Sequence, residues 1–180
     1  GTWTWLAGLD SCEQQGNYGI KGIPSPDNYP GARNGAVVWK MDSGNVYMFG
    51  GNGRDRDSTS GFLNDLWRYN EFSHTWTWIS GGDTVRGDGQ HGVLGVPSPT
   101  NMPGSRRAAV GWNPGNGTLL IFGGYGLAKD HRFGKLSDLW RYDTASGNWT
   151  WLSGPELDDQ RGTYGTLGVA DSANHPGSRS

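Results

Sequence analysis

The sequence is poor in cysteine, in charge of one sign and in long apolar stretches. Cys12 is the only cysteine of the 180 residues, so no disulfide can form within the chain. An inert thiol and a thiol that pairs with another chain both remain open. The net charge is −2 with mixed signs, and without a basic stripe we expect no nucleic acid partner. No apolar run approaches the about 20 residues that cross a membrane, so we expect no membrane insertion.

Signatures of catalysis and metal binding are also missing. The chain has no nucleophile elbow, phosphate-binding loop or zinc pattern. Its histidines, His74, His91, His131 and His175, are scattered over turns and connectors and show no metal-ligand spacing. We therefore expect no catalytic residue, no cofactor-binding residue and no cofactor, and we do not expect the chain to be an enzyme.

Glycine and tryptophan are abundant instead, with 32 and 10 copies. Glycine at this level can indicate disorder, but disordered chains are poor in aromatic residues. The glycines are better explained as turn residues, because tight turns need positive φ. The composition therefore favours a compact all-β chain with many turns.

One unit is repeated along the chain. The segment Asp65–Tyr69, with the sequence Asp-Leu-Trp-Arg-Tyr, returns as Asp138–Tyr142, and the Trp-Thr-Trp of Trp76–Trp78 returns as Trp149–Trp151. The same three residues occur at 3–5, so successive copies lie 149 − 76 = 73 residues apart. Repetition at a fixed period is typical of propellers and solenoids. Every tryptophan falls at a repeat-matched position, which favours packing over ligand binding.

Each unit contains four short segments of strand type that are separated by turn residues. The predicted strands are 35–40, 46–49, 63–69 and 75–79 in the first unit, 108–112, 118–122, 136–142 and 148–152 in the second, and 2–7 at the start. The chain then divides into 1–29 (a last strand plus connector), 30–81 (first complete unit), 82–102 (connector), 103–154 (second complete unit) and 155–180 (connector and start of the next unit). The connectors repeat their glycine positions, so we expect ordered loops over one face of the fold.

The unit resembles the kelch repeat of β-propellers, in a long-repeat subtype that is similar to the central domain of the galactose oxidase family. The resemblance is carried by a diglycine after an apolar strand, and by a tyrosine followed seven residues later by a tryptophan. These residues are Gly50, Gly51, Tyr69 and Trp76 in the first unit and Gly123, Gly124, Tyr142 and Trp149 in the second. The resemblance implies that each unit is a four-stranded antiparallel blade and that these residues are structural. A typical kelch unit has about 50 residues, so the excess here lies largely in the connector.

The polar loops 52–62 and 125–135 are the most variable part of the unit. Variable loops on a stiff scaffold often carry recognition, so we expect partner contacts here. The candidate residues are Arg54, Asp55, Arg56, Asp57, Lys129, Asp130, His131 and Arg132. Asp55 and Asp57 are also weak candidates for a metal site with a hard cation such as Ca²⁺, because such ions take oxygen ligands. The two arginines beside them oppose cation capture, and a solvated loop is favoured.

Buried charge and glycosylation provide the remaining candidates. Asp65 and Asp138 recur with arginines nearby, which indicates structural ion pairs between strands. The partners are either Arg33 and Arg106 or Arg68 and Arg141. Asn116 and Asn148 fit the acceptor pattern for N-glycosylation. Asn116 is the better candidate, because the bulky Trp149 crowds the second position.

Two complete units cannot close a propeller, which has about 4–8 blades. Because the sequence begins and ends within a unit, we expect either copies that assemble or a longer polypeptide. The function favoured by these observations is a non-catalytic scaffold, extracellular or at the cell surface, with other copies or further blades, and a protein or carbohydrate, as partners. The alternative is the propeller part of a secreted enzyme similar to galactose oxidase, although the copper ligands of that family have no residue-by-residue match here.

Overall fold

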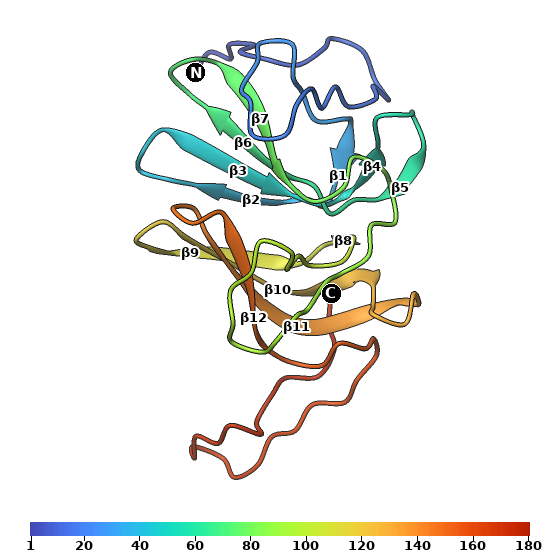
Figure 1. Cartoon of the computed structure of the whole chain (residues 1–180), viewed down its shortest axis with the longest axis vertical. Coiled ribbons are helices and arrows are strands. Elements are labelled where there is room, and N and C mark those ends of the chain that lie inside the picture. The colour runs from blue at the N-terminus through green and yellow to red at the C-terminus, as the bar shows by residue number, and fades with distance from the viewer.

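The computed structural model describes residues 1–180 and consists of β-strands joined by turns and connectors. Twelve strands form three antiparallel sheets, and none of the sheets closes on itself. Figure 1 shows the two larger sheets stacked one above the other, with a small third sheet at one end. A membrane-spanning helix of sufficient length and hydropathy is not found.

The strand orders are simple. The upper sheet of Figure 1 has the order β2-β3-β6-β7 and comprises β2 Val37–Lys40, β3 Asn45–Phe49, β6 Leu66–Asn70 and β7 Thr75–Ser80. The lower sheet has the order β12-β11-β10-β8, with β9 also paired to β10; its strands are β8 Arg106–Arg107, β9 Val110–Gly115, β10 Thr118–Leu127, β11 Phe133–Asp143 and β12 Asn148–Ser153. The small sheet has the order β1-β4-β5, with β1 Arg33–Asn34, β4 Asn52–Arg54 and β5 Ser60–Phe62.

The last hairpin of each large sheet is closed by a polar side chain. The Oδ1 atom of Asn70 accepts hydrogen bonds from the backbone N–H groups of Phe72 and Ser73, at 3.0 and 2.9 Å. The turn between β11 and β12 uses Asp143, whose Oδ1 accepts from two backbone N–H groups at 2.8 and 3.0 Å. These bonds lower the pKa of Asp143. Asparagine and aspartate favour such turns because their side chains mimic a backbone acceptor.

The first diglycine joins the two large sheets. The register of β10 and β11 shifts between Phe122 and Gly124, which is a bulge at the second diglycine. Gly51 has φ +99°, and its N–H donates to the backbone oxygen of Arg106 in the other sheet at 2.8 Å. A Cβ on Gly51 would lie 2.8 Å from the backbone oxygen of Asn34. Only glycine combines this backbone conformation with so close an approach.

The core lies between the two large sheets. From the upper sheet it contains Val37, Trp39, Met41, Tyr47, Phe49 and Leu66, and from the lower sheet Leu119, Ile121, Trp140, Tyr142 and Trp149. The ring of Phe49 meets that of Trp149 edge to face at 5.4 Å between centroids. The indole Nε1 of Trp39 donates to the backbone oxygen of Leu120 across the interface at 3.1 Å. Trp39, Trp140 and Trp149 therefore contribute core packing, as the regular spacing of the tryptophans indicated.

Three expectations about local structure need correction. Residues 2–7 form no strand, because no other strand pairs with their backbone, and Trp3 is fully exposed. The loops 52–62 and 125–135 are largely strands: β4 and β5 form one hairpin, and β10 and β11 continue to Leu127 and Phe133 in the other. The short strands β4 (Asn-Gly-Arg) and β5 (Ser-Gly-Phe) contain no alternation of apolar and polar residues, so the sequence does not indicate their pairing.

The first two connectors lie along sheet edges, and their Tyr18 and His91 side chains also pack on tryptophans of the sheets. Gly22 N–H donates to Trp78 O at 2.8 Å, and Gly95 N–H donates to Trp151 O at 2.8 Å. Residues 20–28 therefore cover the edge strand β7, and residues 93–101 cover β12. Such cover satisfies backbone groups that an open edge would leave free for another chain.

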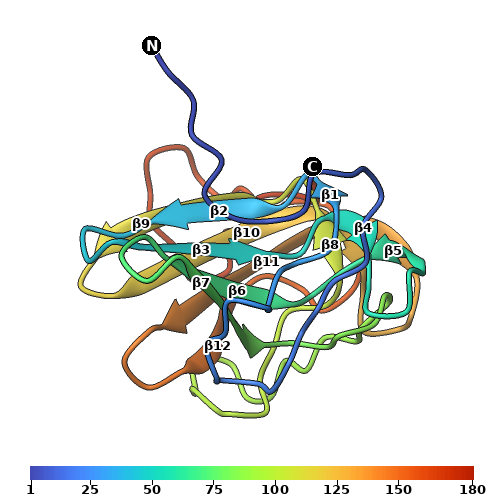
Figure 2. The same ribbon diagram turned by 90° about the horizontal axis from the view of Figure 1, so that it is seen from above.

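Each large sheet has an outer face that lies opposite the core. Side chains alternate along a strand, so the neighbours of core residues point outward. We define the β2 outer face by Val38, Val46, Met48 and Trp76, and the β9 outer face by Val110, Trp112, Leu120 and Phe122. Val38, Val110 and Trp112 are 57%, 63% and 43% exposed. Figure 2, viewed from above, shows the beginning of the chain projecting away from the sheets.

Candidate functional site

The two hairpins that carry the predicted recognition residues lie side by side. The turn 55–59 joins β4 and β5, and the turn 128–132 joins β10 and β11. Both hairpins project at the same end of the stack in Figures 1 and 2. Their contact is made by the rings of Phe62 and Phe133, whose centroids are 5.3 Å apart. The structure thus places the two predicted loops at one common surface.

The charges of the first hairpin are paired with neighbouring segments. Arg54 Nη2 lies 2.7 Å from Glu13 Oε2, and Arg56 forms an ion pair with Asp83. Exposed pairs of this kind contribute about 0–1 kcal/mol, because water and salt screen them. Arg54 and Arg56 therefore tie the hairpin to the connectors on either side.

The second hairpin is held in a similar way. Lys129 Nζ lies 2.6 Å from Glu156 Oε2, and His131 Nδ1 lies 2.9 Å from Asp88 Oδ1. Asp130 Oδ1 accepts from the backbone N–H of Arg132 at 3.3 Å. The side chain of Arg132 is exposed.

Asp55 is buried, which corrects the expectation of a solvated loop at this position. Its Oδ1 accepts from the N–H groups of Asp57 and Thr59 at 2.9 and 2.8 Å, and its Oδ2 accepts from Val85 N–H at 3.1 Å. The carboxylate therefore orders its own turn and holds the following connector. Asp57 is exposed, and no cluster of three acidic, histidine or cysteine residues forms around either aspartate.

An aromatic hollow lies between the hairpins. It has a volume of about 360 Å³ and is lined by Phe62, Tyr125, Phe133 and Arg86, with Asn52 and Ser60. Sequence reasoning missed it, yet a signal was present. The unit offset of 73 places Tyr125 and Phe133 opposite Asn52 and Ser60 of the first unit, so these aromatic residues break the repeat. Aromatic residues that depart from the repeat, such as Tyr125 and Phe133, indicate binding better than those at the repeated packing positions.

Buried ion pairs join the beginning of each unit to its third strand segment. Arg106 donates from Nη1 to Asp138 Oδ1 at 2.6 Å and from Nη2 to Asp138 Oδ2 at 2.7 Å. Trp140 Nε1 adds a donor to Oδ2 at 2.7 Å. Burial opposes the charge of Asp138, but attraction by the Arg106 guanidinium outweighs burial and holds the pKa of Asp138 well below its usual range. Of the two predicted arrangements, the pairs with Arg33 and Arg106 are the ones that form.

The equivalent pair in the upper sheet has one more donor. Arg33 Nη1 and Nη2 donate to Asp65 at 2.6 and 2.8 Å, and Trp67 Nε1 donates to Asp65 Oδ2 at 2.7 Å. Tyr18 from the connector also donates its hydroxyl to Asp65 Oδ2 at 2.7 Å. Burial, together with the Asp65 charge, raises the pKa of Tyr18 well above its usual value, so the hydroxyl remains a donor.

His91 occupies the matching position in the second connector but makes no hydrogen bond. Its ring lies between Trp140 and Trp151, with centroids 4.9 and 5.0 Å away. Its Nε2 is 3.7 Å from Asp138 Oδ2, beyond hydrogen-bond distance, and both ring nitrogens are buried without a partner. The Asp138 carboxylate therefore has one donor fewer than the Asp65 carboxylate.

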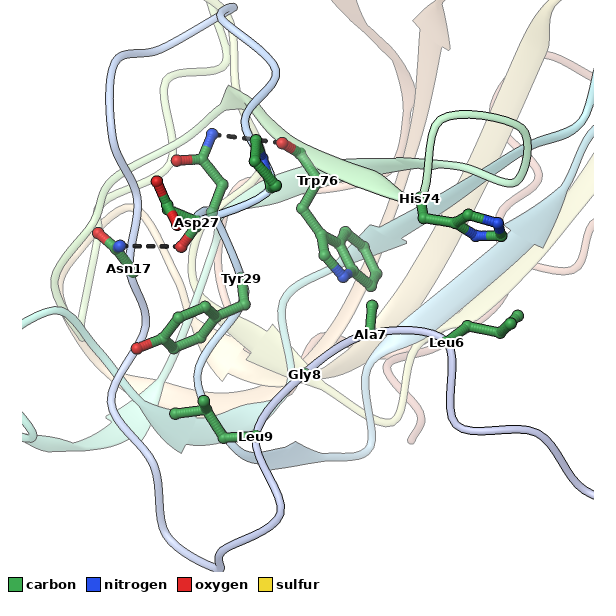
Figure 3. A pocket seen from close by; sticks show the side chains of 11 residues that line it. Leu6, Ala7, Gly8, Leu9, Asn17, Asp27, Tyr29, His74 and Trp76 are labelled. Carbon is green, nitrogen blue, oxygen red and sulfur yellow. Dashed lines mark hydrogen bonds between the residues drawn. The ribbon is translucent and has the colours of Figure 1, made fainter.

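A larger hollow of about 710 Å³ lies beside Trp76, above the upper sheet. Figure 3 shows the Trp76 indole facing Ala7 and Leu6, with Tyr29 and His74 on either side. In the lower sheet the matching Trp149 is covered by Phe49. Trp76 thus lines an open space at the position where Trp149 is packed.

The modification candidates differ in accessibility. Asn116 is exposed at the turn between β9 and β10, with φ +53°. Asn148 begins β12 and is only partly exposed, and Thr150 of its acceptor pattern is buried. Cys12 is exposed and unpaired. Asn116 therefore remains the better glycosylation candidate.

Comparisons with known proteins add little to this description. No family model and no curated protein matches the chain. Ninety-seven chains of solved structures are similar to it. One of them, from "Structure of YjhT", has 18% sequence identity and a TM-score of 0.47, and the similarity covers 71% of this chain and 40% of that chain. A likeness of this strength assigns neither a family nor a function, and this chain spans less than half of that neighbour's length.

Proposed function

We propose that the chain forms two blades of a long-repeat kelch-type propeller and serves as a non-catalytic scaffold. In this proposal further sheets of the same kind pack on its outer faces, and the hairpins between the faces contact a protein or a glycan. Two matched four-stranded arrangements, β2-β3-β6-β7 and β9-β10-β11-β12, support the assignment of one blade to each unit.

The observation that carries the proposal is the contrast between the inner and outer faces. Val37 and Trp39 of the upper sheet are buried against β9, where a Cβ on Gly111 would touch both. Their counterparts 73 residues later, Val110 and Trp112, are 63% and 43% exposed. The same side-chain types are therefore covered on one sheet and bare on the other. Exposed apolar surface of this kind typically marks an interaction site.

The two outer faces complement each other. Phe49 covers Trp149 within the chain, and Phe122 stands at the position that matches Phe49. Trp76, which matches Trp149, lines an open hollow. The β9 outer face of one pair of sheets therefore suits the β2 outer face of the next. Such a head-to-tail contact forms a ring if the rotation closes and a filament if it does not.

Native mass tests this proposal, with the denatured mass measured on the same material. The chain has a mass of 19.5 kDa. If copies assemble, the native mass is a multiple of this value, and if the sheets belong to a longer polypeptide, the denatured mass exceeds it. The variant Trp112→Lys should lower the native mass, whereas Phe72→Lys, at a hairpin turn and 80% exposed, should not. A single-chain native mass for wild-type material of 19.5 kDa at micromolar concentration would contradict the proposal.

We also propose an extracellular or cell-surface location. The support is the acceptor Asn116, which is exposed in the turn between β9 and β10. For protein made through a secretory route, removal of N-glycans should lower the mass of the wild-type chain and not that of Asn116→Gln. Identical masses before and after enzymatic treatment would count against use of this acceptor.

A further inference from the structure

The hollow between the hairpins combines aromatic rings with unpaired positive charge. Phe62 is at its centre: its ring meets Tyr125 edge to face at 5.8 Å and Phe133 at 5.3 Å between centroids. All three rings are partly exposed. The volume of about 360 Å³ lies near the lower end of the range for small-molecule sites, ~300–1,000 Å³. A ligand the size of one sugar ring suits this space.

Two arginines flank the rings. Arg86 lies over Phe133 with its Cζ 5.8 Å from the ring centroid, and Arg107 lies over Phe62 at 5.6 Å. Neither arginine forms an ion pair; the arginines that do are Arg33, Arg54, Arg56 and Arg106. No acidic side chain lines the hollow. Its local charge is therefore positive, although the chain as a whole has a net charge of −2.

Neutral polar groups complete the lining. The Asn52 amide, the Ser60 hydroxyl and the Tyr125 hydroxyl each supply a donor and an acceptor. Sugar hydroxyls also donate and accept, so they match this mixture. An acidic peptide would engage the arginines but would leave the aromatic rings and the paired donor-acceptor groups without use.

We propose that the hollow binds an acidic sugar, namely a glycan unit with a carboxylate such as a uronic or sialic acid. The apolar face of the sugar ring packs on Phe133 and Phe62, its carboxylate pairs with Arg86, which lines the hollow, and its hydroxyls bind the neutral polar groups. Guanidinium-carboxylate pairs combine charge with directed hydrogen bonds, which gives the selectivity for acidic sugars. This inference deepens the part of the proposed function in which the hairpins contact a protein or a glycan, and it does not require that copies assemble.

Titration with simple glycosides tests the inference. The probes are methyl β-D-glucuronide and the methyl glycoside of N-acetylneuraminic acid, with methyl β-D-glucoside as the neutral reference, monitored by calorimetry and ligand-observed NMR. At least one acidic probe should bind with a Kd in the approximately millimolar range and about tenfold more tightly than the glucoside. The affinity should fall as salt is raised, because the charges are exposed. The probe that binds identifies the type of acidic sugar.

Variants locate the site. Arg86→Gln should lower the affinity for the acidic probe about tenfold. The backbone N–H of residue 86, which donates to Phe62 O at 2.8 Å, is kept in this variant. Phe133→Ala should abolish detectable binding. Arg132→Gln, an exposed arginine of the adjacent turn outside the hollow, is the matched control and should bind as the wild type does.

Several results would overturn the inference. One is equal affinity for the acidic probes and the neutral glucoside, and another is an equal loss of affinity in Arg132→Gln and Arg86→Gln. The absence of binding by every probe at about tens of millimolar would also overturn it. So would binding of hexaglutamate at the hollow when no sugar probe binds. Thermal unfolding and native mass of the same samples separate the two proposals. Loss of sugar binding with unchanged stability and mass refutes only the sugar site, whereas sugar binding by a single-chain species refutes only the assembly.

Discussion

His91→Tyr should stabilise the chain, because it supplies a hydrogen bond that the matching position already has. The Tyr18 hydroxyl donates to Asp65 Oδ2 at 2.7 Å, whereas the distance from His91 Nε2 to Asp138 Oδ2 is 3.7 Å. The second distance is longer by 3.7 − 2.7 = 1.0 Å. The tyrosine hydroxyl extends beyond the reach of an imidazole nitrogen. Both rings sit between two tryptophans at similar centroid distances, so the larger ring has a place ready for it.

The magnitude follows from the kind of bond that is added. A hydrogen bond to a charged group contributes about 1.5–3 kcal/mol. The substitution also removes two buried ring nitrogens that lack partners. For a chain of this size about 1 kcal/mol shifts the melting temperature by about 2–4 °C, so we expect a rise of about 3–12 °C.

Thermal unfolding followed by tryptophan fluorescence measures the shift. Tyr18→Phe is the reciprocal variant, and it should lower the melting temperature by a similar amount because Asp65 loses one donor. The reasoning is refuted if His91→Tyr leaves the melting temperature unchanged or lowers it while Tyr18→Phe behaves as expected. That result would mean that the space above Asp138 does not admit the hydroxyl.

Three other variants or conditions have expected outcomes in chemical denaturation. Arg106→Met should lower the free energy of unfolding by about 3–5 kcal/mol, because it leaves the buried carboxylate of Asp138 uncompensated. Lys40→Met removes an exposed ion pair at 3.1 Å and should lower it by no more than about 1 kcal/mol. Equal losses in the two variants would contradict the difference in burial. Gly124→Ala should destabilise the chain more than Gly115→Ala. Both glycines have positive φ, +95° and +101°, so both variants incur the backbone strain of about 1–2 kcal/mol. Only at Gly124 does the new Cβ also lie 2.7 Å from a backbone oxygen, whereas the space at Gly115 is open. The pKa of Asp138 is lower in the folded than in the unfolded chain. Its contribution to stability should therefore be complete above about pH 5 and should be lost as the pH falls through the folded pKa. Asp138→Asn should weaken the dependence of stability on pH, and an unchanged dependence would show that Asp138 is not its cause.

The strands of the two large sheets were predictable because their local sequence and their packing agree. Trp-Thr-Trp at 76–78 and 149–151 combines aromatic and β-branched residues with period-2 alternation, and both segments are strands. The diglycine at 123–124 coincides with a bulge, because two consecutive positive-φ residues interrupt the register. Each of these signals is local, so the sequence contains it directly.

The prediction of a strand at 2–7 was wrong, although the sequence of this segment matches that of Trp149–Trp151 and the neighbouring residues. Strand type depends on a partner as well as on propensity, and this segment has none in the structure. The hairpins at 52–62 and 125–135 were missed for the opposite reason: their polar residues conceal a pairing that the adjacent β1 and β8 strands stabilise. Pairing partners that are distant in sequence leave no local signal.

The candidate sites show the same division. The ion pair of Arg106 and Asp138 was predicted as one of two arrangements, because the recurrence of both residues indicated a structural role without giving the geometry. The burial of Asp55 depends on the N–H of Val85, thirty residues later in the sequence, and was not predictable from its own loop. The aromatic hollow requires Phe62 and Phe133 to meet across two units, which only the stacking of the sheets brings about.

Cross-linking between copies examines whether the outer faces pack as the inner ones do. Within the chain, Val37 lies against the position of Gly111, so between copies Val110 should lie against Val38. In a Cys12→Ser background, a mixture of the single variants Val38→Cys and Val110→Cys should form a disulfide-linked heterodimer under mild oxidation, because the two side chains should be in direct contact and a disulfide forms only between close Cβ atoms. Each variant alone should cross-link much less. A mixture that gives no heterodimer, or Val110→Cys that forms homodimers as readily as the mixture forms heterodimers, would contradict head-to-tail stacking of the two faces.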